Sequence, residues 1–416
     1  MSLNDRLTEL RTGFTSTFWI ANTLELFERL AFYGMKAVLV VFLAEKAGLH
    51  EEAGKLAGLF SGVIYLLPIL AGVLVDKYGF KKTLMACFGI FSMGYLLIGL
   101  AGMEWGEPIT QAIGKRTYVI IVLLLTAVGG SLIKPCIVGT VAKTSQEHVR
   151  GLGFSIYYSL VNLGGAIGPM LAMLVRQDLG IEFVLVMSAF TCFLLFLGTW
   201  FFFREPEADN GEAKRTFGKV FSDMLLVFGN FRFLLFLILF SGFWIMFWQI
   251  FYLLPFYATD VLHFEQFEIL ETVDAWCIIF FSVFMAAVFK KWKPFTAMTI
   301  GFVVASLSWI IIGLFGTTAA VVFGVAIFAI GEATQAPRFY EYVNSLAPPD
   351  QVGTYMGFAF LPVAIGSFGA GAVADWLRLS YLDANPSMMW FVLAGIGLTS
   401  TLLMVLYDRV LINGKS

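Results

Sequence analysis

The chain has 416 residues, of which 59% are hydrophobic and 13% are charged, and its formal net charge is −2. An average soluble domain is about 25% charged, so this composition excludes an ordinary soluble fold. Continuous apolar runs of about 18 residues or more indicate membrane helices and exclude a membrane β-barrel, whose strands alternate apolar and polar residues. The small net charge gives no indication of a nucleic-acid partner.

The apolar runs predict twelve membrane-spanning helices, since about 20 apolar residues cross the hydrocarbon core of a bilayer. A charged segment at residues 204–230 separates the first six from the last six. We therefore expect an all-α membrane protein with six-helix halves at residues 1–203 and 231–416, packed about a central cavity. The linker is expected to be cytoplasmic and partly an amphipathic helix on the membrane surface. The predicted spans are residues 13–43, 54–75, 81–102, 117–143, 151–176, 181–203, 231–258, 267–289, 294–315, 319–345, 351–377 and 386–411.

The basic residues predict the orientation of the chain. With the N-terminus inside, 17 of the 27 Lys and Arg residues fall in cytoplasmic segments, and six fall on the opposite side. Cytoplasmic segments of membrane proteins carry such an excess of positive charge. We therefore predict a multi-pass protein of the plasma (inner) membrane, surrounded by lipid, with both termini cytoplasmic. The first span is expected to be an uncleaved insertion signal, and the protein is expected to be a monomer.

Four charged residues interrupt the first span: Glu25, Glu28, Arg29 and Lys36. On insertion scales a charge near the bilayer centre costs roughly 2.5–3.5 kcal/mol, so these side chains are expected to face protein or water. The spacing of Glu25, Arg29 and Lys36 places them within about 40° of one another on a helix, and Tyr33 continues this stripe. Glu25 and Arg29 have the i,i+4 spacing of an ion pair. The stripe predicts either a static cluster that locks helices together or a functional site.

Two segments resemble motifs of known transporters. Residues 25–36 resemble the ExxERFxYYG motif of the proton-dependent oligopeptide transporter family, a branch of the major facilitator superfamily. The loop at residues 72–82 is similar to the GxxxD(R/K)xGxKK loop of that superfamily. In this loop Gly72 and Gly79 are expected to permit close backbone packing. Asp76 is expected to cap a neighbouring helix end or to pair with a basic residue there.

Three further blocks resemble the same family and imply contacts with substrate. Tyr65, in the second span, stands where the family has a binding-site tyrosine. Lys134 precedes Pro135 in the fourth span, as a lysine does in the family, where it is implicated in binding the substrate carboxylate and in coupling. Residues 154–165 resemble the FYxxINxG motif and contain Asn162. This amide is expected to hydrogen-bond across helices or to contact a peptide group, and the resemblance favours the second.

The tenth span and its exit also resemble the family. Residues 331–337 and 346–357 are similar to ExxxSP followed by LAPxxxxGxMMG. The resemblance implies that Glu332 binds the amino group of the substrate. Arg338 and Glu341 have i,i+3 spacing and are expected to pair with each other near the cytoplasmic gate.

The chain departs from this family at positions that bear on the site. Lys36 stands where the family usually has arginine, so the bidentate fork for a carboxylate is lost. Residues 243–249 resemble FWxxF(D/E)Q, but Trp248 occupies the acidic position, which removes the negative partner of the first-helix cation. Asp274, where the family tends to have asparagine, is expected to restore that charge from one helix further on. The chain also lacks the two extra linker helices of many bacterial members.

From this resemblance we expect a secondary active transporter that carries di- and tripeptides together with protons by alternating access. Protonation of Glu25 or Glu28 would release Arg29 or Lys36 and change the relative stability of the outward- and inward-open states. No cofactor or metal is expected, because protons are the coupling ion. The residues expected to couple proton movement are Glu25, Glu28, Arg29 and Asp274. Those expected to bind substrate are Tyr33, Lys36, Tyr65, Lys134, Asn162, Trp244 and Glu332. Gating or structural roles are expected for Gly72, Asp76, Lys77, Arg338 and Glu341.

Other classes of function remain as alternatives. The same fold can import or export another small solute or drug that bears an amino group or a carboxylate. A receptor or lipid-handling protein is a further alternative, although it would have little use for a buried lysine opposite a carboxylate. An enzyme is not expected, because the sequence has no nucleophile–base pair and no nucleotide loop. The four cysteines lie in predicted spans and the three histidines at span ends or in loops, which predicts neither disulfides nor a metal site.

Overall fold

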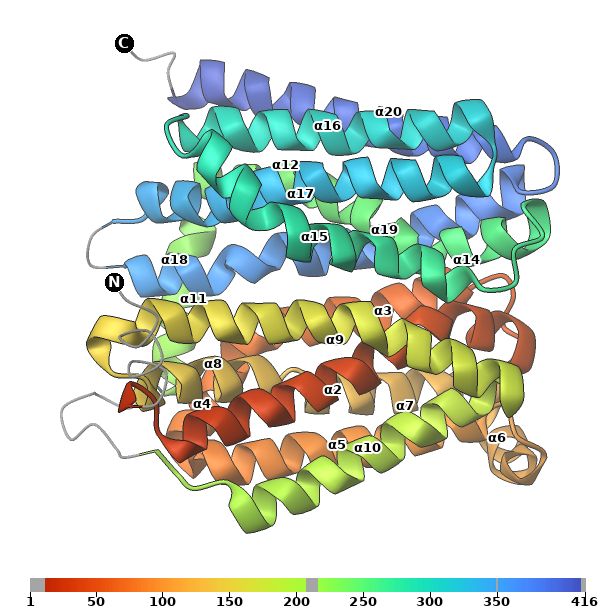
Figure 1. Cartoon of the computed structure of the whole chain (residues 1–416), viewed down its shortest axis with the longest axis horizontal. Helices are drawn as coiled ribbons and strands as arrows, with labels where there is room; N and C mark the ends of the chain where they lie inside the picture. The colour runs from red at the N-terminus through yellow and green to blue at the C-terminus, as the bar shows by residue number, and fades with distance from the viewer. Residues whose placement is uncertain (1–11, 207–215, 349–350, 413–416) are drawn as a thin grey trace. The chain divides into compact units, whose positions relative to one another are not determined.

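A computed structural model describes residues 12–206, 216–348 and 351–412, and nearly all of these residues are helical (Figure 1). The prediction of an all-α membrane protein is confirmed. The helices of the first half are α2 (Ser16–Val41), α3 (Ala53–Leu66), α4 (Pro68–Tyr78), α5 (Phe80–Leu100), α6 (Glu107–Ile113), α7 (Lys115–Gly130), α8 (Ile133–Thr144), α9 (Arg150–Asp178) and α10 (Ile181–Phe202). Three short helical segments accompany them: η1 (Phe42–Lys46), η2 (Glu104–Gly106) and η3 (Glu147–Val149).

The second part of the chain is equally helical. Its helices are α11 (Phe217–Gly229), α12 (Phe231–Phe247), α13 (Gln249–Tyr252), α14 (Leu254–Phe256), α15 (Phe267–Phe289), α16 (Pro294–Phe315), α17 (Thr318–Leu346), α18 (Val352–Gly357), α19 (Leu361–Tyr381) and α20 (Pro386–Tyr407). Its short segments are η4 (Tyr257–Val261), η5 (Phe358–Phe360) and η6 (Asp408–Ile412).

Each predicted span corresponds to one helix or to consecutive helices. In the described residues, ten helices are long and apolar enough to cross a membrane, or eleven if the bent pair of α3 and α4 is one span. α2, with 26 residues, has the length of a membrane helix but is not among these, because it contains four charged side chains. The bend of 48° between α3 and α4 occurs where Pro68 begins the second helix. Proline has no amide hydrogen to donate to the preceding turn, and its ring clashes with the carbonyl group there, which explains the break.

The described residues group into two compact units. The first comprises Met1–Met35 and Leu67–Val220, and the second comprises Lys36–Leu66 and Phe221–Ser416, as far as they are described. This grouping differs from the two sequence halves in one stretch. Residues 36–66, which include the end of α2 and all of α3, group with the second unit, and the packing of α3 gives the reason.

α3 packs against α19 through a row of glycines spaced four residues apart. A Cβ atom on Gly58 would lie 2.6 Å from the backbone oxygen of Ser367, and one on Gly54 would lie 2.7 Å from that of Gly371. Asp375 then accepts hydrogen bonds from the backbone amides of Gly54 at 2.8 Å and Lys55 at 2.9 Å. Small residues let two helix backbones approach this closely. The contact between α3 and α19 therefore explains why residues 36–66 group with the second unit.

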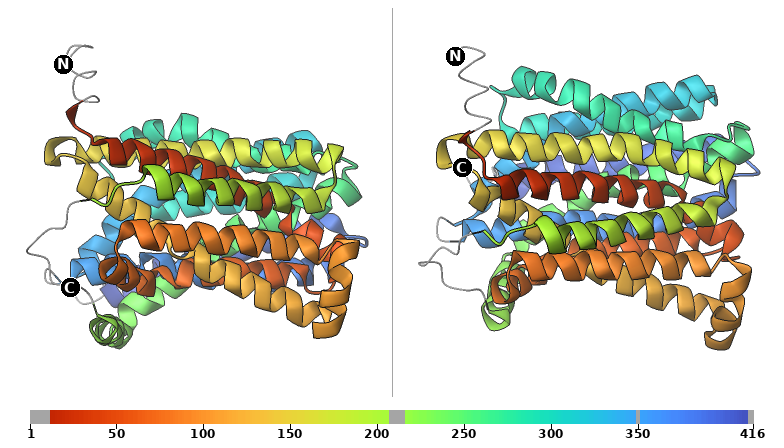
Figure 2. Two further views of the ribbon diagram at one scale, coloured as in Figure 1. Left: turned by 90° about the horizontal axis from the view of Figure 1, so that it is seen from below. Right: turned by 60° about the horizontal axis from the view of Figure 1, so that its bottom comes forward.

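In the first unit, α2 lies between two neighbours. Figure 2 shows it (red) between α9 (yellow) and α10 (yellow-green). A Cβ atom on Gly168 of α9 would lie 2.6 Å from the backbone oxygen of Leu30. On the other side, Ser188 of α10 donates a hydrogen bond to the backbone oxygen of Ala31 at 3.0 Å. The close approach at Gly168 brings the charged side chains of α2 near those of α9.

The loop between α4 and α5 matches its prediction only in part. Gly79 has a φ of 85°, and the backbone amides of Phe80 and Lys81 donate to the Glu205 carboxylate at 2.6 and 2.8 Å. A Cβ atom on Gly79 would lie 2.8 Å from that carboxylate, so glycine is required twice over. The expectation for Gly72 is wrong for the part of the chain that the structure describes, because a Cβ atom there would meet no described atom within 4 Å.

Asp76 and Lys77 both lie exposed beside this loop. Lys77 Nζ is 5.0 Å from the centroid of the Tyr78 ring. The side chain of Glu205, from the segment after α10, caps the first turn of α5, and the capping or pairing role expected of Asp76 stays a prediction.

The linker contains one helix, α11. Its large apolar side chains divide between two faces: Val227 is buried, whereas Phe221 and Leu225 are exposed. The predicted helix in the linker is confirmed, and its position on the membrane surface stays a prediction. Residues 207–215 of the linker lie outside the described residues.

Candidate functional site

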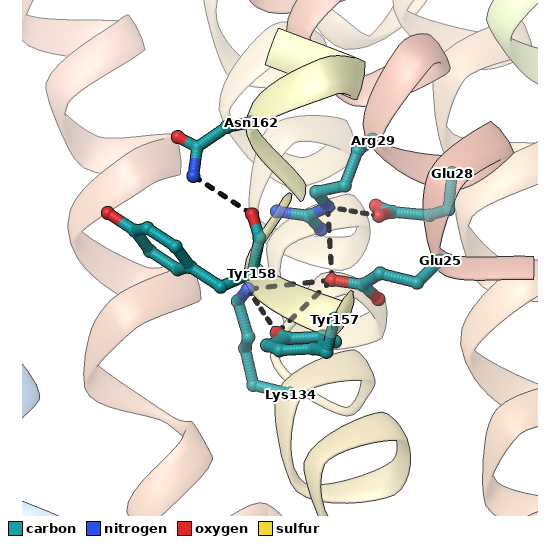
Figure 3. A network of polar contacts seen from close by, with 7 residues as sticks. All are labelled: Glu25, Glu28, Arg29, Lys134, Tyr157, Tyr158 and Asn162. Carbon is teal, nitrogen blue, oxygen red and sulfur yellow. Dashed lines mark hydrogen bonds and ion pairs between the residues drawn. The ribbon is translucent and has the colours of Figure 1, made fainter. Parts of the chain in front are cut away.

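The first cluster of charged side chains surrounds Arg29 in the first unit (Figure 3). Arg29 Nε donates a hydrogen bond to Glu28 Oε2 and lies 3.6 Å from Glu25 Oε1. The predicted i,i+4 ion pair is therefore confirmed. Glu25 and Glu28 are completely buried, and Arg29 is 3% exposed. Within the described chain, Oε2 of Glu25 and Oε1 of Glu28 are buried without a hydrogen-bond partner.

Glu25 also receives groups from two other helices. Lys134 Nζ, on α8, lies 3.5 Å from Glu25 Oε1, and Tyr157 Oη, on α9, donates to the same oxygen at 3.3 Å. Lys134 in turn donates to Tyr157 Oη at 2.7 Å. Figure 3 shows this oxygen of Glu25 at the centre of the network, facing the positive charges of both Arg29 and Lys134. The two acids and two bases balance in charge.

Lys134 lies beside a two-residue turn that interrupts the fourth predicted span. α7 ends at Gly130 and α8 begins at Ile133, so Lys134 lies in the first turn of a new helix. Glycine weakens a helix, and Pro135 has no amide hydrogen to donate to the preceding turn. The glycine pair and Pro135 therefore explain why the regular helix is interrupted between Gly130 and Ile133.

The other predicted members of this cluster lie beside it. Asn162 Nδ2 donates to the backbone oxygen of Tyr158 at 2.9 Å, within α9 (Figure 3). Among the described residues this amide makes no hydrogen bond across helices, and a contact with substrate stays a prediction. Arg29 Cζ lies 4.7 Å from the ring centroid of Phe32 and 5.9 Å from that of Tyr33, so both rings attract its charge.

Lys36 lies seven residues after Arg29 on α2, but all its contacts are in the second unit. Its Nζ donates hydrogen bonds to Ser61 Oγ and, at 3.0 Å, to Tyr252 Oη. It also lies 4.0 Å from the ring centroid of Trp248 and 4.8 Å from that of Tyr252. The side chain is 1% exposed. An aromatic ring face therefore takes the place of the carboxylate that the motif would supply at Trp248.

The expected ion pair between Lys36 and Asp274 is not formed. The carboxylate whose charge acts on Lys36 is that of Glu271, one turn earlier on α15. Glu271 is 2% exposed.

Two further residues predicted to bind substrate, Tyr65 and Trp244, stand beside Trp248. The ring centroids of Tyr65 and Trp248 are 5.8 Å apart, and those of Trp244 and Trp248 are 6.4 Å apart. Trp244 also packs edge-on against Phe247, with ring centroids 5.2 Å apart. The aromatic cluster thus extends from Trp244 and Tyr65 to Trp248, whose ring contacts the ammonium group of Lys36.

The remaining predicted residues lie on α15 and α17. Asp274 is 9% exposed, Glu332 is partly exposed, and the charge of Asp274 acts on Glu332. Arg338 Nη1 donates to Glu341 Oε2 at 2.7 Å, so the predicted i,i+3 pair is confirmed. A gating role for that pair stays a prediction.

A family model described as the Major Facilitator Superfamily matches residues 25–371, a stretch that contains both clusters of charged side chains. The chain belongs to the Major Facilitator Superfamily. The predicted fold class is thereby confirmed, and this superfamily member is a multi-pass membrane protein. A solved structure of a POT family transporter in complex with 5-aminolevulinic acid has a TM-score of 0.76, with 17% sequence identity, and covers 95% of this chain and 96% of that one. Identity this low shows likeness of fold.

Curated relatives of the superfamily member fall into two groups. Peptide transporter family 1 of Drosophila melanogaster is 28% identical over 167 residues, which are 39% of this chain and 22% of that protein. Multidrug resistance protein MdtH of Photorhabdus laumondii subsp. laumondii is 23% identical over 376 residues, which are 89% of this chain and 88% of that protein. The resemblance to peptide transporters seen in the motifs is confirmed. The match covers less than a quarter of the Drosophila protein, whereas it covers most of MdtH.

Sequence reasoning missed four side chains in these clusters: Tyr157, Ser61, Tyr252 and Glu271. Tyr252 follows Trp248 by four residues, which puts both on one face of a helical segment, so this spacing was an available signal. Glu271 precedes Asp274 by three residues on the same helix and could have been found in the same way. Ser61 and Tyr157 carry no such signal, because they come to the site from other helices.

Proposed function

We propose that this superfamily member is a secondary active transporter that moves short peptides together with protons by alternating access. The observation that carries the proposal is the position of Glu25. One oxygen of this fully buried carboxylate faces Arg29, Lys134 and Tyr157, and the other is buried without a hydrogen-bond partner in the described chain. When such a carboxylate binds a proton, it loses its negative charge and with it the attraction of both neighbouring cations, Arg29 and Lys134.

The coupling step follows from these contacts. A proton that binds the free oxygen of Glu25 removes the negative charge between Arg29 and Lys134. Lys134, whose side chain is 22% exposed, then leaves Glu25 and binds the carboxylate of the peptide. Glu332 binds the peptide's ammonium group, while Tyr33, Tyr65 and Asn162 contact its middle. Proton and peptide thus bind the same state, and each favours the binding of the other.

Uptake into liposomes tests this function. We expect the purified protein to accumulate labelled Ala-Ala against its gradient when the outside is acidic. Glu25→Gln removes the buried acid that takes the proton and should keep counterflow exchange while losing uphill uptake, whereas Glu147→Gln, at an exposed acid of the same unit, should retain both. Full uphill accumulation by Glu25→Gln would refute the coupling step. Absence of Ala-Ala transport by the wild type would refute the peptide assignment.

A second candidate function is export of an amine-bearing drug. It is favoured by the match to MdtH, which covers 88% of that protein, and by the aromatic side chains around Lys36. Expression in drug-sensitive cells distinguishes the two functions. An exporter raises tolerance to cationic drugs and is not inhibited by Ala-Ala, whereas a peptide importer confers sensitivity to toxic dipeptides.

We further propose a monomer in the plasma (inner) membrane with both termini cytoplasmic and with protons as its only coupling partner. The excess of Lys and Arg on one side supports this orientation. Cysteines placed at the exposed residues Lys82 and Lys46 test it. An impermeant maleimide added to intact cells should label Lys46→Cys and leave Lys82→Cys unlabelled, and the reverse result would invert the topology. Light scattering of the purified protein measures its oligomeric state.

A further inference from the structure

A hollow of about 710 Å³ opens in the second unit, at the corner where α11 turns into α12. Pockets of about 300–1,000 Å³ hold small-molecule ligands, so this hollow has room for one. Its lining joins apolar walls to three polar side chains. The apolar residues are Leu225, Leu226 and Phe231, and the polar ones are Asn230, Arg232 and Gln351.

The position of the hollow in the chain points to a lipid. α12 opens the candidate membrane span Phe231–Val261, so its first residues lie where the hydrocarbon core meets the head groups of the bilayer. On α11, Phe221, Leu225 and Phe228 follow one another at intervals of four and three residues, and all three are exposed. This spacing puts them on one face of the helix, where they extend the apolar wall of the hollow.

The charge of the hollow favours an anion. Arg232 is the one charged side chain among the described residues that line it, and within the described chain this arginine forms no ion pair. The charge of Asp408 acts, as that of Arg232 does, on the hydroxyl group of Tyr407, but Asp408 does not line the hollow. A guanidinium group can donate two parallel hydrogen bonds to a phosphate. A choline or ethanolamine group would bring a second cation, for which the described lining offers no carboxylate.

We propose that this hollow binds the head group of an anionic phospholipid, with Arg232 at the phosphate and the apolar face of α11 against the acyl chains. Asn230 connects the site to the rest of the unit. Its Nδ2 donates to Tyr355 Oη of α18 at 2.7 Å, and its Oδ1 accepts from the backbone amide of Phe233 at 3.1 Å. A lipid in the hollow therefore lies beside the contact between α12 and α18. The site does not depend on which solute the protein transports.

Titration of the purified protein with lipid, followed by native mass spectrometry, tests the site. The probes are palmitoyl-oleoyl phosphatidylglycerol, which is anionic, and palmitoyl-oleoyl phosphatidylcholine, which is zwitterionic. We expect the wild type to bind one phosphatidylglycerol at least about tenfold more tightly than phosphatidylcholine, the value of one hydrogen bond to a charged group. Arg232→Gln should lose this preference, and Arg232→Lys, which keeps the charge without the fork, should retain part of it. Lys291→Gln changes an exposed lysine of the same unit outside the hollow and should behave as the wild type.

A second variant tests the hollow without changing its charge. Gly229 also lines it, and a Cβ atom there would meet no described atom within 4 Å, so a leucine fits without a clash and fills the space. Gly229→Leu should weaken the binding of phosphatidylglycerol although Arg232 is intact. Each variant is first checked for a single folded species by gel filtration.

The outcomes decide between a built site and general attraction to a basic surface. Equal affinity of the wild type for the two lipids overturns the proposal, as does a full preference for phosphatidylglycerol in Arg232→Gln. A loss in Lys291→Gln as large as that in Arg232→Gln would show attraction to surface charge in general and would also overturn it. Wild-type affinity in Gly229→Leu would remove the hollow from the binding site.

Discussion

The ammonium nitrogen of Lys36 lies 4.0 Å from the centroid of the Trp248 ring. The motif that these two residues resemble pairs a cation with an acid, which gives an ion pair that a proton can break. A ring face attracts the cation but cannot be protonated. Under the proposed function, the coupling proton therefore binds Glu25 or Glu28 and not an acid beside Lys36.

The contact between Lys36 and Trp248 should be measurable as a coupling energy. A buried cation–π contact contributes about 1–2 kcal/mol. We expect Trp248→Leu to destabilise the protein, and the loss to be smaller by about 1 kcal/mol in a Lys36→Met background. Chemical denaturation of the four proteins in detergent gives the cycle. Trp244→Leu is the matched control and should be additive with Lys36→Met, and additivity at Trp248 itself would contradict the contact.

Two glycine-to-alanine changes should have opposite effects on the stability of the folded protein. At Gly58 the new methyl group would lie 2.6 Å from the backbone oxygen of Ser367, so the two helices must separate. Overpacking of this kind destabilises by about 1–3 kcal/mol. At Gly72 a methyl group meets nothing within 4 Å, and alanine should stabilise the interior of α4 by about 0.5–1 kcal/mol. Thermal unfolding of both variants checks this prediction. Equal changes in unfolding temperature would show that close packing of Gly58 against α19 does not determine stability.

Asp375 should protect the first turn of α3 against local unfolding. Its carboxylate accepts hydrogen bonds from the backbone amides of Gly54 and Lys55, in the first turn of α3, as an N-cap side chain does. Loss of such a cap costs about 0.5–2 kcal/mol. We expect Asp375→Ala to speed amide hydrogen exchange across the first turns of α3, and Asp375→Asn, which keeps one acceptor oxygen, to lie between it and the wild type. Asp383→Ala, at an exposed acid, is the control, and unchanged exchange in Asp375→Ala would argue against the cap.

Lys134 should recognise the carboxyl group of the substrate. If Lys134 transfers from Glu25 to the peptide, amidation of Ala-Ala should weaken its binding to the wild type by about tenfold, the value of one hydrogen bond to a charged group. The same amidation should have little effect in Lys134→Ala. Lys143→Ala changes an exposed lysine on the same helix and should keep the full penalty. A Lys134→Ala variant that still discriminates against the amide would remove Lys134 from the binding site.

The positions of the helices and the local pairs could be read from the sequence. Hydrophobic run length located the ten long apolar helices and the bent pair of α3 and α4 to within a few residues, because the bilayer sets a minimum length for a span. The ion pairs Glu25–Arg29 and Arg338–Glu341 followed from helical spacing, since both partners lie on one helix. The expectation of close packing at Gly72 failed because a glycine within a motif does not reveal whether another backbone lies opposite it.

The tertiary structure alone decided which charges meet across helices. Lys36 and Tyr252 are 216 positions apart, and no local rule connects them. The sequence offered Asp274 as a partner for Lys36, but in the folded chain Lys36 lies over the Trp248 ring and donates hydrogen bonds to Ser61 and Tyr252. The sequence determined that a membrane helix contains charges at a definite spacing. Which of them are neutralised within the protein, and which await a ligand, depends on distances of a few ångströms between helices that only the folded chain defines.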